Sequence, residues 1–372
     1  MTGKNSQFNL LLGSPKQSIR LVLHDGTTFV GQSFGFNQSA AGEVVFNTAM
    51  SGYPESLTDP SYRGQILVLT YPMVGNYGVP PMVREHDVLK YFESENTHIK
   101  ALVVSEYSAE ASHWNSWKTL SQWPVENKIP AISGVDIRAL TSYIREKGVM
   151  AGKILVDDED LEFEDTDSIN LVEQVSTKDV VTYGSGKHKV VLVDCGVKTN
   201  IIRRLLLRDT TVIRVPWDCN FMDMEYDGLF ISNGPGDPKM LTTTIANLSK
   251  AIKADKPIFG ICLGNQLLAL AAGGNTYKLK YGHRSHNQPV RMLNSNQCFI
   301  TSQNHGFATD MKTLGDDWEE LFINLNDQTN EGIRHRSKPI FSTQFHPEAS
   351  SGPTDTDFLF DDFVELIKNS KR

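Results

Sequence analysis

Residues 257–266 read Pro-Ile-Phe-Gly-Ile-Cys-Leu-Gly-Asn-Gln, and they decide how the second half of the chain is interpreted. The apolar run Ile258–Ile261 predicts a buried strand, and the apolar residues from Leu263 onward predict a helix. Two glycines between these elements let the backbone turn sharply without a Cβ clash. We therefore interpret the stretch as a nucleophile elbow, which holds Cys262 in a cleft at the end of a strand.

A cysteine at the end of an apolar strand is more often a packing residue than a nucleophile. The flanking glycines and the following helix favour the nucleophile for Cys262, because a helix N-terminus stabilises a thiolate. Cys195, Cys219 and Cys298 lack this setting, and we interpret them as packing residues. The four cysteines show no CxxC spacing, so a reducing compartment is expected and neither a zinc ribbon nor a dense disulfide framework is indicated.

The residues around the elbow alternate between strand and helix patterns. Strands are predicted at 190–193, 211–215, 228–232 and 258–261, and helices at 199–207 and 241–253. This alternation predicts an α/β domain over residues 189–372, with an open, mostly parallel sheet and helices on both faces. Ligands of such sheets bind beyond the carboxyl ends of the strands, which here are followed by the loops 234–238 and 260–264.

The first half of the chain is richer in β-structure. A hairpin is predicted around Asp25-Gly26, further strands at 43–46, 65–70 and 101–104, and helices at 114–123 and 136–147. We expect a smaller β-rich β/β/α domain over residues 19–155. Residues 156–188, which are acidic at first and polar at the end, are interpreted as a linker, and residues 1–18 as a flexible tail.

Composition narrows the possible functions. The 372 residues suit two domains, and 40% hydrophobic with 22% charged residues is typical of a globular protein. A net charge of −8 and a pI near 5.7 argue against a nucleic-acid partner. No apolar run approaches the roughly 20 residues that span a bilayer, so no membrane segment is expected. Residues 1–20 have only a weak likeness to a mitochondrial transit peptide, so the cytoplasm is the expected compartment and the mitochondrion the alternative.

A base for Cys262 is suggested by the sequence Gln344-Phe-His-Pro-Glu348. Residues two apart in an extended chain project to the same side, so His346 and Glu348 can face one point. His346 would exchange the proton of the thiol, and Glu348 would orient the imidazole. His305 is the rival base, but a glycine follows it and its segment is interpreted as a ligand-lining loop.

A third motif, Asn-Gly-Pro-Gly-Asp-Pro at residues 233–238, follows the strand before the elbow. By itself it is most simply a tight turn. Next to the elbow, however, the N–H groups of Gly234 and Gly236 could donate to a developing oxyanion, together with the N–H of Leu263.

Taken together, the three motifs resemble class I glutamine amidotransferases. Four stretches in the first half, at 42–48, 52–55, 57–62 and 75–78, are similar to the amino-terminal domain of the small, glutamine-hydrolysing subunit of carbamoyl-phosphate synthetase. The resemblance runs from about residue 19 to about residue 367. It implies hydrolysis of L-glutamine through a glutamyl thioester at Cys262, with His346 and Glu348 completing the catalytic group.

The resemblance also implies the substrate contacts and the partner. Glutamine would be bound by a set of residues from both domains, namely Ser61, Gly234, Gly236, Leu263, Gln266, Asn304, Gly306 and Phe307. The ammonia would pass to a synthetase large subunit or fused synthetase domain, which uses ATP and magnesium to make carbamoyl phosphate for pyrimidine, arginine or urea synthesis. No cofactor and no metal are expected in this chain.

Some features leave alternatives open. Within the family, the ammonia-dependent urea-cycle form lacks the nucleophilic cysteine, whereas this sequence has Cys262 and is expected to depend on glutamine. Asn265 and Ser285 depart from the common family residues, histidine and glycine, and could alter turnover. A different amidotransferase and a non-catalytic docking module are the competing functions. Both a separate subunit and a part of a fused enzyme fit the sequence.

Overall fold

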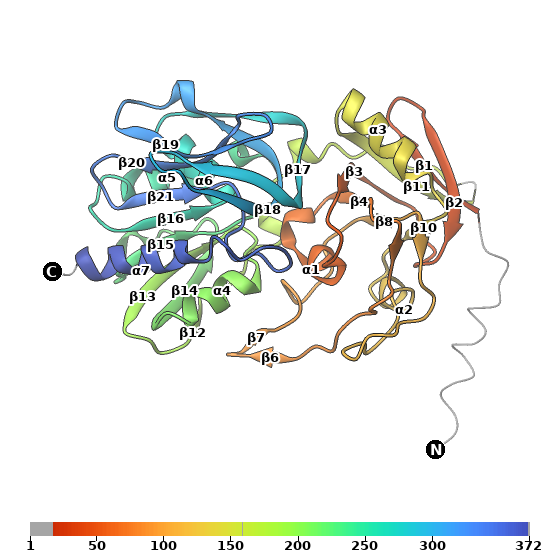
Figure 1. The fold of residues 1–372 in the computed structure, drawn as a ribbon, viewed down its shortest axis with the longest axis horizontal. Helices are drawn as coiled ribbons and strands as arrows, with labels where there is room; N and C mark the ends of the chain where they lie inside the picture. The colour runs from red at the N-terminus through yellow and green to blue at the C-terminus, as the bar shows by residue number, and fades with distance from the viewer. Residues whose placement is uncertain (1–17, 158, 371–372) are drawn as a thin grey trace, which may run out of the picture.

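The computed structural model describes residues 18–157 and 159–370 and places two β-rich parts side by side (Figure 1). A closed barrel is formed by the first half of the chain, drawn red to yellow, and a larger sheet with helices by the second half, drawn green to blue. The predicted tail lies outside the described residues except for Ser18, which begins the first strand. No helix within these ranges is long and apolar enough to cross a membrane.

The barrel has the strand order β1-β11-β3-β4-β8-β10-β2. Its strands are β1 (Ser18–Leu23), β2 (Thr28–Ser33), β3 (Ala40–Asn47), β4 (Gln65–Leu69), β8 (Ala101–Val103), β10 (Ala131–Ser133) and β11 (Met150–Val156). The predicted hairpin is confirmed, since β1 and β2 pair antiparallel and Gly26 takes the turn with a φ of 88°. Closure of the barrel through the pairing of β10 with β2 was not predicted.

Short elements connect the barrel strands. They are the helices α1 (Tyr53–Thr58), α2 (Gln122–Glu126) and α3 (Ile137–Lys147), and the two-residue strands β5 (Met73–Val74), β6 (Arg84–Glu85), β7 (Val88–Leu89) and β9 (Glu106–Tyr107). The predicted helix at 136–147 is confirmed by α3, whose cap residue Asp136 accepts a hydrogen bond from the amide of Ala139. The apolar face of α3 packs against the barrel through Ile137, Leu140 and Ile144.

The predicted helix at 114–123 is wrong. The segment is irregular until α2 begins at Gln122, and the side chains of Trp114 and Trp117 are 84% and 74% exposed. Their spacing imitates a helical repeat, but the backbone around Lys118 pairs with Val79 instead. The amide of Val79 donates to the carbonyl of Lys118, and the amide of Trp117 donates to the carbonyl of Val79. Because long-range pairing satisfies these groups, the local helical pattern is overridden.

The predicted linker has structure of its own. Residues 156–188 contain the short helices η2 (Thr166–Ser168) and η3 (Val172–Gln174) and the strand β12 (Val181–Tyr183), which pairs with the large sheet. Val172 is fully buried in a core of that sheet. Apolar residues therefore anchor the stretch interpreted as a linker to the second half of the chain. The domain boundaries themselves remain a prediction.

The large sheet has the order β12-β14-β13-β15-β16-β21-β20-β19-β17-β18. Its remaining strands are β13 (His188–Asp194), β14 (Thr210–Pro216), β15 (Gly228–Ile231), β16 (Ile258–Ile261), β17 (Asn275–Met292), β18 (Cys298–Asp310), β19 (Trp318–Asn324), β20 (Asn330–His335) and β21 (Ile340–Thr343). The central strands from β14 to β21 are parallel, as predicted. The antiparallel extension from β20 to β18 was not anticipated.

Helices cover both faces of this sheet, which confirms the predicted α/β class (Figure 1). One face packs α4 (Thr199–Leu206) and α7 (Phe358–Ser370), and the other packs α5 (Thr242–Ala251) and α6 (Leu263–Ala271). Successive side chains of strand β13 point to opposite faces of the sheet, so each face has a hydrophobic core of its own. Val190 and Leu192 face the first pair of helices, and Val191 and Val193 face the second. The carboxyl ends of β15, β16 and β21 then converge on one edge, toward the barrel.

Candidate active site

Cys262 lies at the sharp turn between β16 and α6. Its φ of 55° is a left-handed value that residues other than glycine rarely adopt. Glycine is required on both sides, because a Cβ on Gly260 would lie 2.7 Å from the carbonyl oxygen of Gly264, and a Cβ on Gly264 would lie 2.4 Å from that of Ile231. The predicted elbow is therefore present, and strain of this kind is typical of functional sites.

A cleft beside Cys262 is lined by three parts of the chain. The barrel contributes Glu43, Ser61, Arg63 and Gln65, the segment before β12 contributes Thr166, Asp167 and Leu171, and the large sheet contributes Gly234, Pro235, Gly236, Cys262, Gln266, Lys278, Arg284, Asn304, His305, Gly306 and Phe307. The thiol also lies at the N-terminus of α6, where the helix dipole favours a negative charge. The cleft thus offers a nucleophile beside a mixture of cationic, anionic and backbone groups.

His346 and Glu348 follow strand β21 and meet in the same region. Nδ1 of His346 lies 2.7 Å from Oε1 of Glu348, and both side chains are buried. Because a carboxylate only accepts, Nδ1 carries the proton of this hydrogen bond. Nε2 of His346 has no hydrogen-bond partner among the described residues. That nitrogen is therefore available to exchange a proton, as the predicted role requires.

Electrostatics strongly favour the charged forms of this pair. Burial lowers the pKa of His346, but the charge of Glu348 and the side-chain contacts with Cys262 and Glu348 together outweigh burial and raise the pKa to about 10. Burial raises the pKa of Glu348, but the positive charges of Lys198 and His346 bring it down to about 2. His346 is therefore an imidazolium at neutral pH, and such a cation stabilises a neighbouring thiolate.

Lys198 is a site residue that the sequence analysis missed. Its Nζ lies 3.0 Å from Oε1 of Glu348 and donates to the carbonyl oxygen of Ala349 at 2.6 Å. Burial lowers the pKa of Lys198, but the carboxylates around it, Glu348 foremost, raise it above its ordinary value. A lysine between the carboxyl end of strand β13 and the start of helix α4 was the available signal.

The residues predicted to contact glutamine gather around the cleft with one exception. Ser61, Gly234, Gly236, Gln266, Asn304, Gly306 and Phe307 all line it. Leu263 does not, because its side chain is buried in the core between the sheet and helices α5 and α6. Only its backbone could contact glutamine. Nε2 of Gln266 donates to the carbonyl of Phe307 at 2.9 Å, which links α6 to β18. Whether these residues bind glutamine remains a prediction.

Contacts across the cleft join the barrel to the large sheet. Nδ2 of Asn233 donates to Oγ of Ser61 at 2.9 Å, and Nδ2 of Asn304 lies 3.2 Å from a carboxylate oxygen of Asp59. Lys278 is paired at 2.6 Å with Glu43 of the barrel, and at 2.6 Å with Asp167 in η2. The relative position of the two halves therefore sets the shape of the cleft.

His305, the rival base, is placed differently from His346. Its Nδ1 lies 2.8 Å from the carbonyl oxygen of Phe307, and its Nε2 lies 3.1 Å from Oε1 of Gln303. Burial lowers the pKa of His305 well below its ordinary value. Because Nδ1 donates to a backbone carbonyl and Nε2 faces the side chain of Gln303, the geometry favours His346 as the partner of Cys262.

The residues that depart from the family pattern lie outside the cleft lining. Asn265 is buried and accepts a hydrogen bond from the hydroxyl of Ser342 at 2.7 Å, and the hydroxyl of Ser285 accepts from Gln288 at 3.0 Å.

Of the cysteines interpreted as packing residues, Cys195 is buried, and burial raises the pKa of its thiol. The interpretation of Cys298 as a packing residue is wrong, since this residue is exposed near the start of β18.

Comparison with known proteins gives the family. The family model "Carbamoyl-phosphate synthase small chain, CPSase domain" matches residues 21–154, and "Glutamine amidotransferase class-I" matches residues 191–366. The carbamoyl phosphate synthase arginine-specific small chain of Phaeosphaeria nodorum is 48% identical over 366 residues, which is 95% of this chain and 77% of that protein. The chain belongs to the carbamoyl-phosphate synthase small chain family.

Two longer proteins are also similar to this chain. The mitochondrial carbamoyl-phosphate synthase [ammonia] of Aquarana catesbeiana is 50% identical over 367 residues, or 97% of this chain but 24% of the relative. The multifunctional protein CAD of Squalus acanthias is 52% identical over 358 residues, which is 94% of this chain and 16% of the relative. The chain therefore spans a quarter or less of the length of these relatives.

Proposed function

We propose that this chain hydrolyses L-glutamine to glutamate and ammonia and delivers the ammonia to a carbamoyl-phosphate synthetase. The observation that carries the proposal is the elbow that presents Cys262 beside the buried pair of His346 and Glu348, 2.7 Å apart. A nucleophile, a base and a group that orients the base are the requirements of acyl transfer through a covalent intermediate.

The reaction has two halves. The thiolate of Cys262 attacks the side-chain amide carbon, and the oxyanion that forms is stabilised by backbone N–H groups at Leu263 and Gly234. The imidazolium of His346 gives its proton to the leaving nitrogen, so ammonia departs and a glutamyl thioester remains. His346 then removes a proton from water, which attacks the thioester and releases glutamate. Glutamine and water thus give glutamate and ammonia, and Cys262 is regenerated.

Glutamine binding is assigned to the cleft residues of both halves. Ser61 from the barrel would close the pocket next to the turn at Gly234 and Gly236, while Asn304, Gly306 and Phe307 of β18 would line its side. Gln266 supports that strand through its bond to Phe307. A zwitterionic substrate suits this setting, because the cleft also contains the charges of Lys278 and Glu43.

The partner is a synthetase subunit or a fused synthetase region, which supplies the ATP and magnesium site. The names of the arginine-specific small chains among the relatives favour arginine synthesis over pyrimidine synthesis as the use of the product. A cytoplasmic or mitochondrial compartment fits four cysteines that form no disulfide with one another.

Replacing Cys262 with alanine tests the proposal. Glutamine-dependent carbamoyl-phosphate synthesis should be abolished in the complex with a synthetase, whereas synthesis from added ammonia should continue, because the substitution removes the nucleophile and leaves the docking surface intact. Cys298→Ala is the matched control, since its thiol is exposed and lies outside the cleft lining. Glutamine hydrolysis that survives in Cys262→Ala would refute the assignment.

A further inference from the structure

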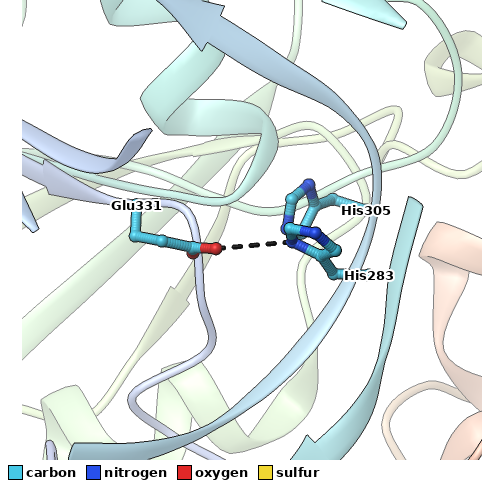
Figure 2. A group of neighbouring side chains, drawn as sticks. All are labelled: His283, His305 and Glu331. Atoms are coloured by element: carbon cyan, nitrogen blue, oxygen red, sulfur yellow. Dashed lines mark ion pairs between the residues drawn. The ribbon is translucent and has the colours of Figure 1, made fainter. Parts of the chain in front are cut away.

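Three buried side chains from three strands of the large sheet meet behind the cleft. His283 of β17, His305 of β18 and Glu331 of β20 each offer a ligand atom within 4.8 Å of the others. His283 and His305 are direct partners in the register of β17 and β18, and their rings pack edge to face with centroids 4.9 Å apart. Figure 2 shows the carboxylate of Glu331 pointing at this pair of rings.

Each ring makes one hydrogen bond that points away from the centre of this group of three side chains. These hydrogen bonds decide which ring nitrogen keeps a lone pair toward the centre. Nδ1 of His305 lies 2.8 Å from the carbonyl oxygen of Phe307, so it must donate, and Nε2 keeps its lone pair. Nε2 of His283 lies 2.8 Å from a carboxylate oxygen of Asp327, so it also donates. In the neutral ring this leaves the lone pair of His283 on Nδ1, which lies 3.4 Å from Oε1 of Glu331.

Two of the inward atoms lack hydrogen bonds. Nδ1 of His283 and Oε2 of Glu331 have no hydrogen-bond partner within the described part of the chain, although Glu331 is fully buried and His283 is only 7% exposed. A buried carboxylate oxygen and a buried ring nitrogen that make no hydrogen bond are costly. Converging lone pairs also repel one another unless a cation lies between them.

We propose that His283, His305 and Glu331 bind one divalent transition-metal ion, with Zn²⁺ the best match. Two imidazoles and one carboxylate are donors that suit zinc, whereas magnesium and calcium prefer oxygen ligands alone. Asp327 behind His283 and the carbonyl of Phe307 behind His305 provide the outer hydrogen bonds that orient metal-ligating histidines. Oε1 of Gln303, 3.1 Å from Nε2 of His305, adds an oxygen donor next to the site.

The ion would be structural, because it joins β17, β18 and β20, and His305 is the only one of its three ligands that lines the cleft. It would steady the segment that holds Asn304 and Gly306.

The full-length chain tests the site without any assay of catalysis. After equilibration with Zn²⁺ and gel filtration in a weak chelator, the chain should retain about one zinc ion, and Co²⁺ should give the visible absorption of a tetrahedral site with nitrogen and oxygen ligands. A variant with Cys262→Ala and Cys298→Ala should retain the same amount, which excludes binding by these thiols. A wild-type chain that retains no zinc and shows no cobalt band would overturn the proposal, whatever the variants do.

Variants separate the ligands from their surroundings. Glu331→Gln and His283→Asn should reduce the retained zinc to less than about a tenth, and Asp327→Asn should weaken zinc binding on the order of 10–100-fold, the usual effect of losing an outer hydrogen bond. His86→Asn, at an exposed histidine of the barrel half, is the matched control and should change nothing. Equal zinc retention by wild type and Glu331→Gln, with circular dichroism showing both folded, would also refute the site.

Discussion

A buried chain of charges controls the chemistry at the scale of single residues. Lys198, Glu348 and His346 follow one another at distances of 3.0 and 2.7 Å, and the two carboxylate contacts share Oε1 of Glu348. Each charge is costly to bury alone, and each is stabilised by its neighbour. This row of three charged side chains ends at Nε2 of His346, so the protonation state of that nitrogen depends on charges that never touch the substrate.

Replacing Glu348 with glutamine should lower the pKa of His346. The wild-type imidazole keeps its proton until about pH 10, whereas in the variant burial and Lys198 act without the opposing carboxylate, and the proton should be lost below neutral pH. Alkylation of Cys262 by iodoacetamide and glutamine turnover, measured against pH, should both show this shift. An unchanged alkaline limb would mean that Glu348 does not set the charge of His346.

The same pKa shift has a consequence for stability. Because the pKa of His346 in the folded protein lies above its ordinary value of 6.5, protonation stabilises the fold fully below pH 6.5, and this contribution is lost as the pH rises toward 10. The melting temperature of wild type should therefore fall more than that of Glu348→Gln over this range.

Lys198→Met should destabilise the protein, because it leaves the buried carboxylate of Glu348 without one of its two cations. Removing one partner of a buried ion pair costs about 3–5 kcal/mol. Urea denaturation measures the free energy of unfolding directly. Lys189→Met is the control, since Lys189 forms its 2.7 Å pair with Glu225 at the surface, and it should have little effect. Equal stability of the two variants would contradict the role assigned to Lys198.

Backbone geometry is the decisive feature at the scale of elements. The turn between β16 and α6 works only because Gly260 and Gly264 bring the helix against the neighbouring strand backbone. The parallel strands then align the ends of β15, β16 and β21, so that the Gly234 turn, Cys262 and His346 emerge on the same edge. The catalytic group is thus assembled by strand order rather than by proximity in the sequence.

Gly264→Ala should damage both stability and activity. Its Cβ would lie 2.4 Å from the backbone carbonyl of Ile231, so the helix must move away from the sheet, at a cost of about 1–3 kcal/mol. A displacement of the nucleophile by 1 Å costs on the order of 10²-fold in rate. Melting temperature and turnover measure the two effects. Gly315→Ala, where nothing lies within 4 Å of the added Cβ and φ is not positive, should leave both unchanged.

The cleft is a property of the whole molecule. Ser61 belongs to the barrel half and Asn233 to the large sheet, and their hydrogen bond, together with the pairing of Lys278 with Glu43, fixes the two halves against each other. A synthetase that docks on the barrel would adjust the same contacts. We therefore expect the isolated chain to hydrolyse glutamine slowly and to be accelerated by its partner.

Ser61→Ala should raise the KM for glutamine more than it lowers kcat, because a hydroxyl that contacts the bound substrate contributes equally before and during the reaction. Steady-state kinetics with and without the synthetase measure this split. Ser337→Ala, at an exposed serine in the loop between β20 and β21, serves as the control. A change confined to kcat would show that Ser61 acts on the position of the catalytic group and not on glutamine binding.

Local features were predictable from the sequence alone. The elbow around Cys262, the pairing of His346 with Glu348, the hairpin at Gly26 and the helix α3 all depend on residues close in the chain, whose geometry is fixed by glycine conformations, strand alternation and caps. The alternation of strands and helices in the second half gave the α/β class for the same reason.

Long-range pairing decided the rest. Tertiary contacts closed the barrel, replaced the helix expected at 114–123 with a pairing to Val79, and gave the supposed linker a buried Val172. They also brought Lys198 to Glu348 and placed His283 opposite Glu331. No local rule predicts these contacts, because their energy comes from burying and pairing groups that are far apart in the chain, and only the register of the strands determines which groups meet.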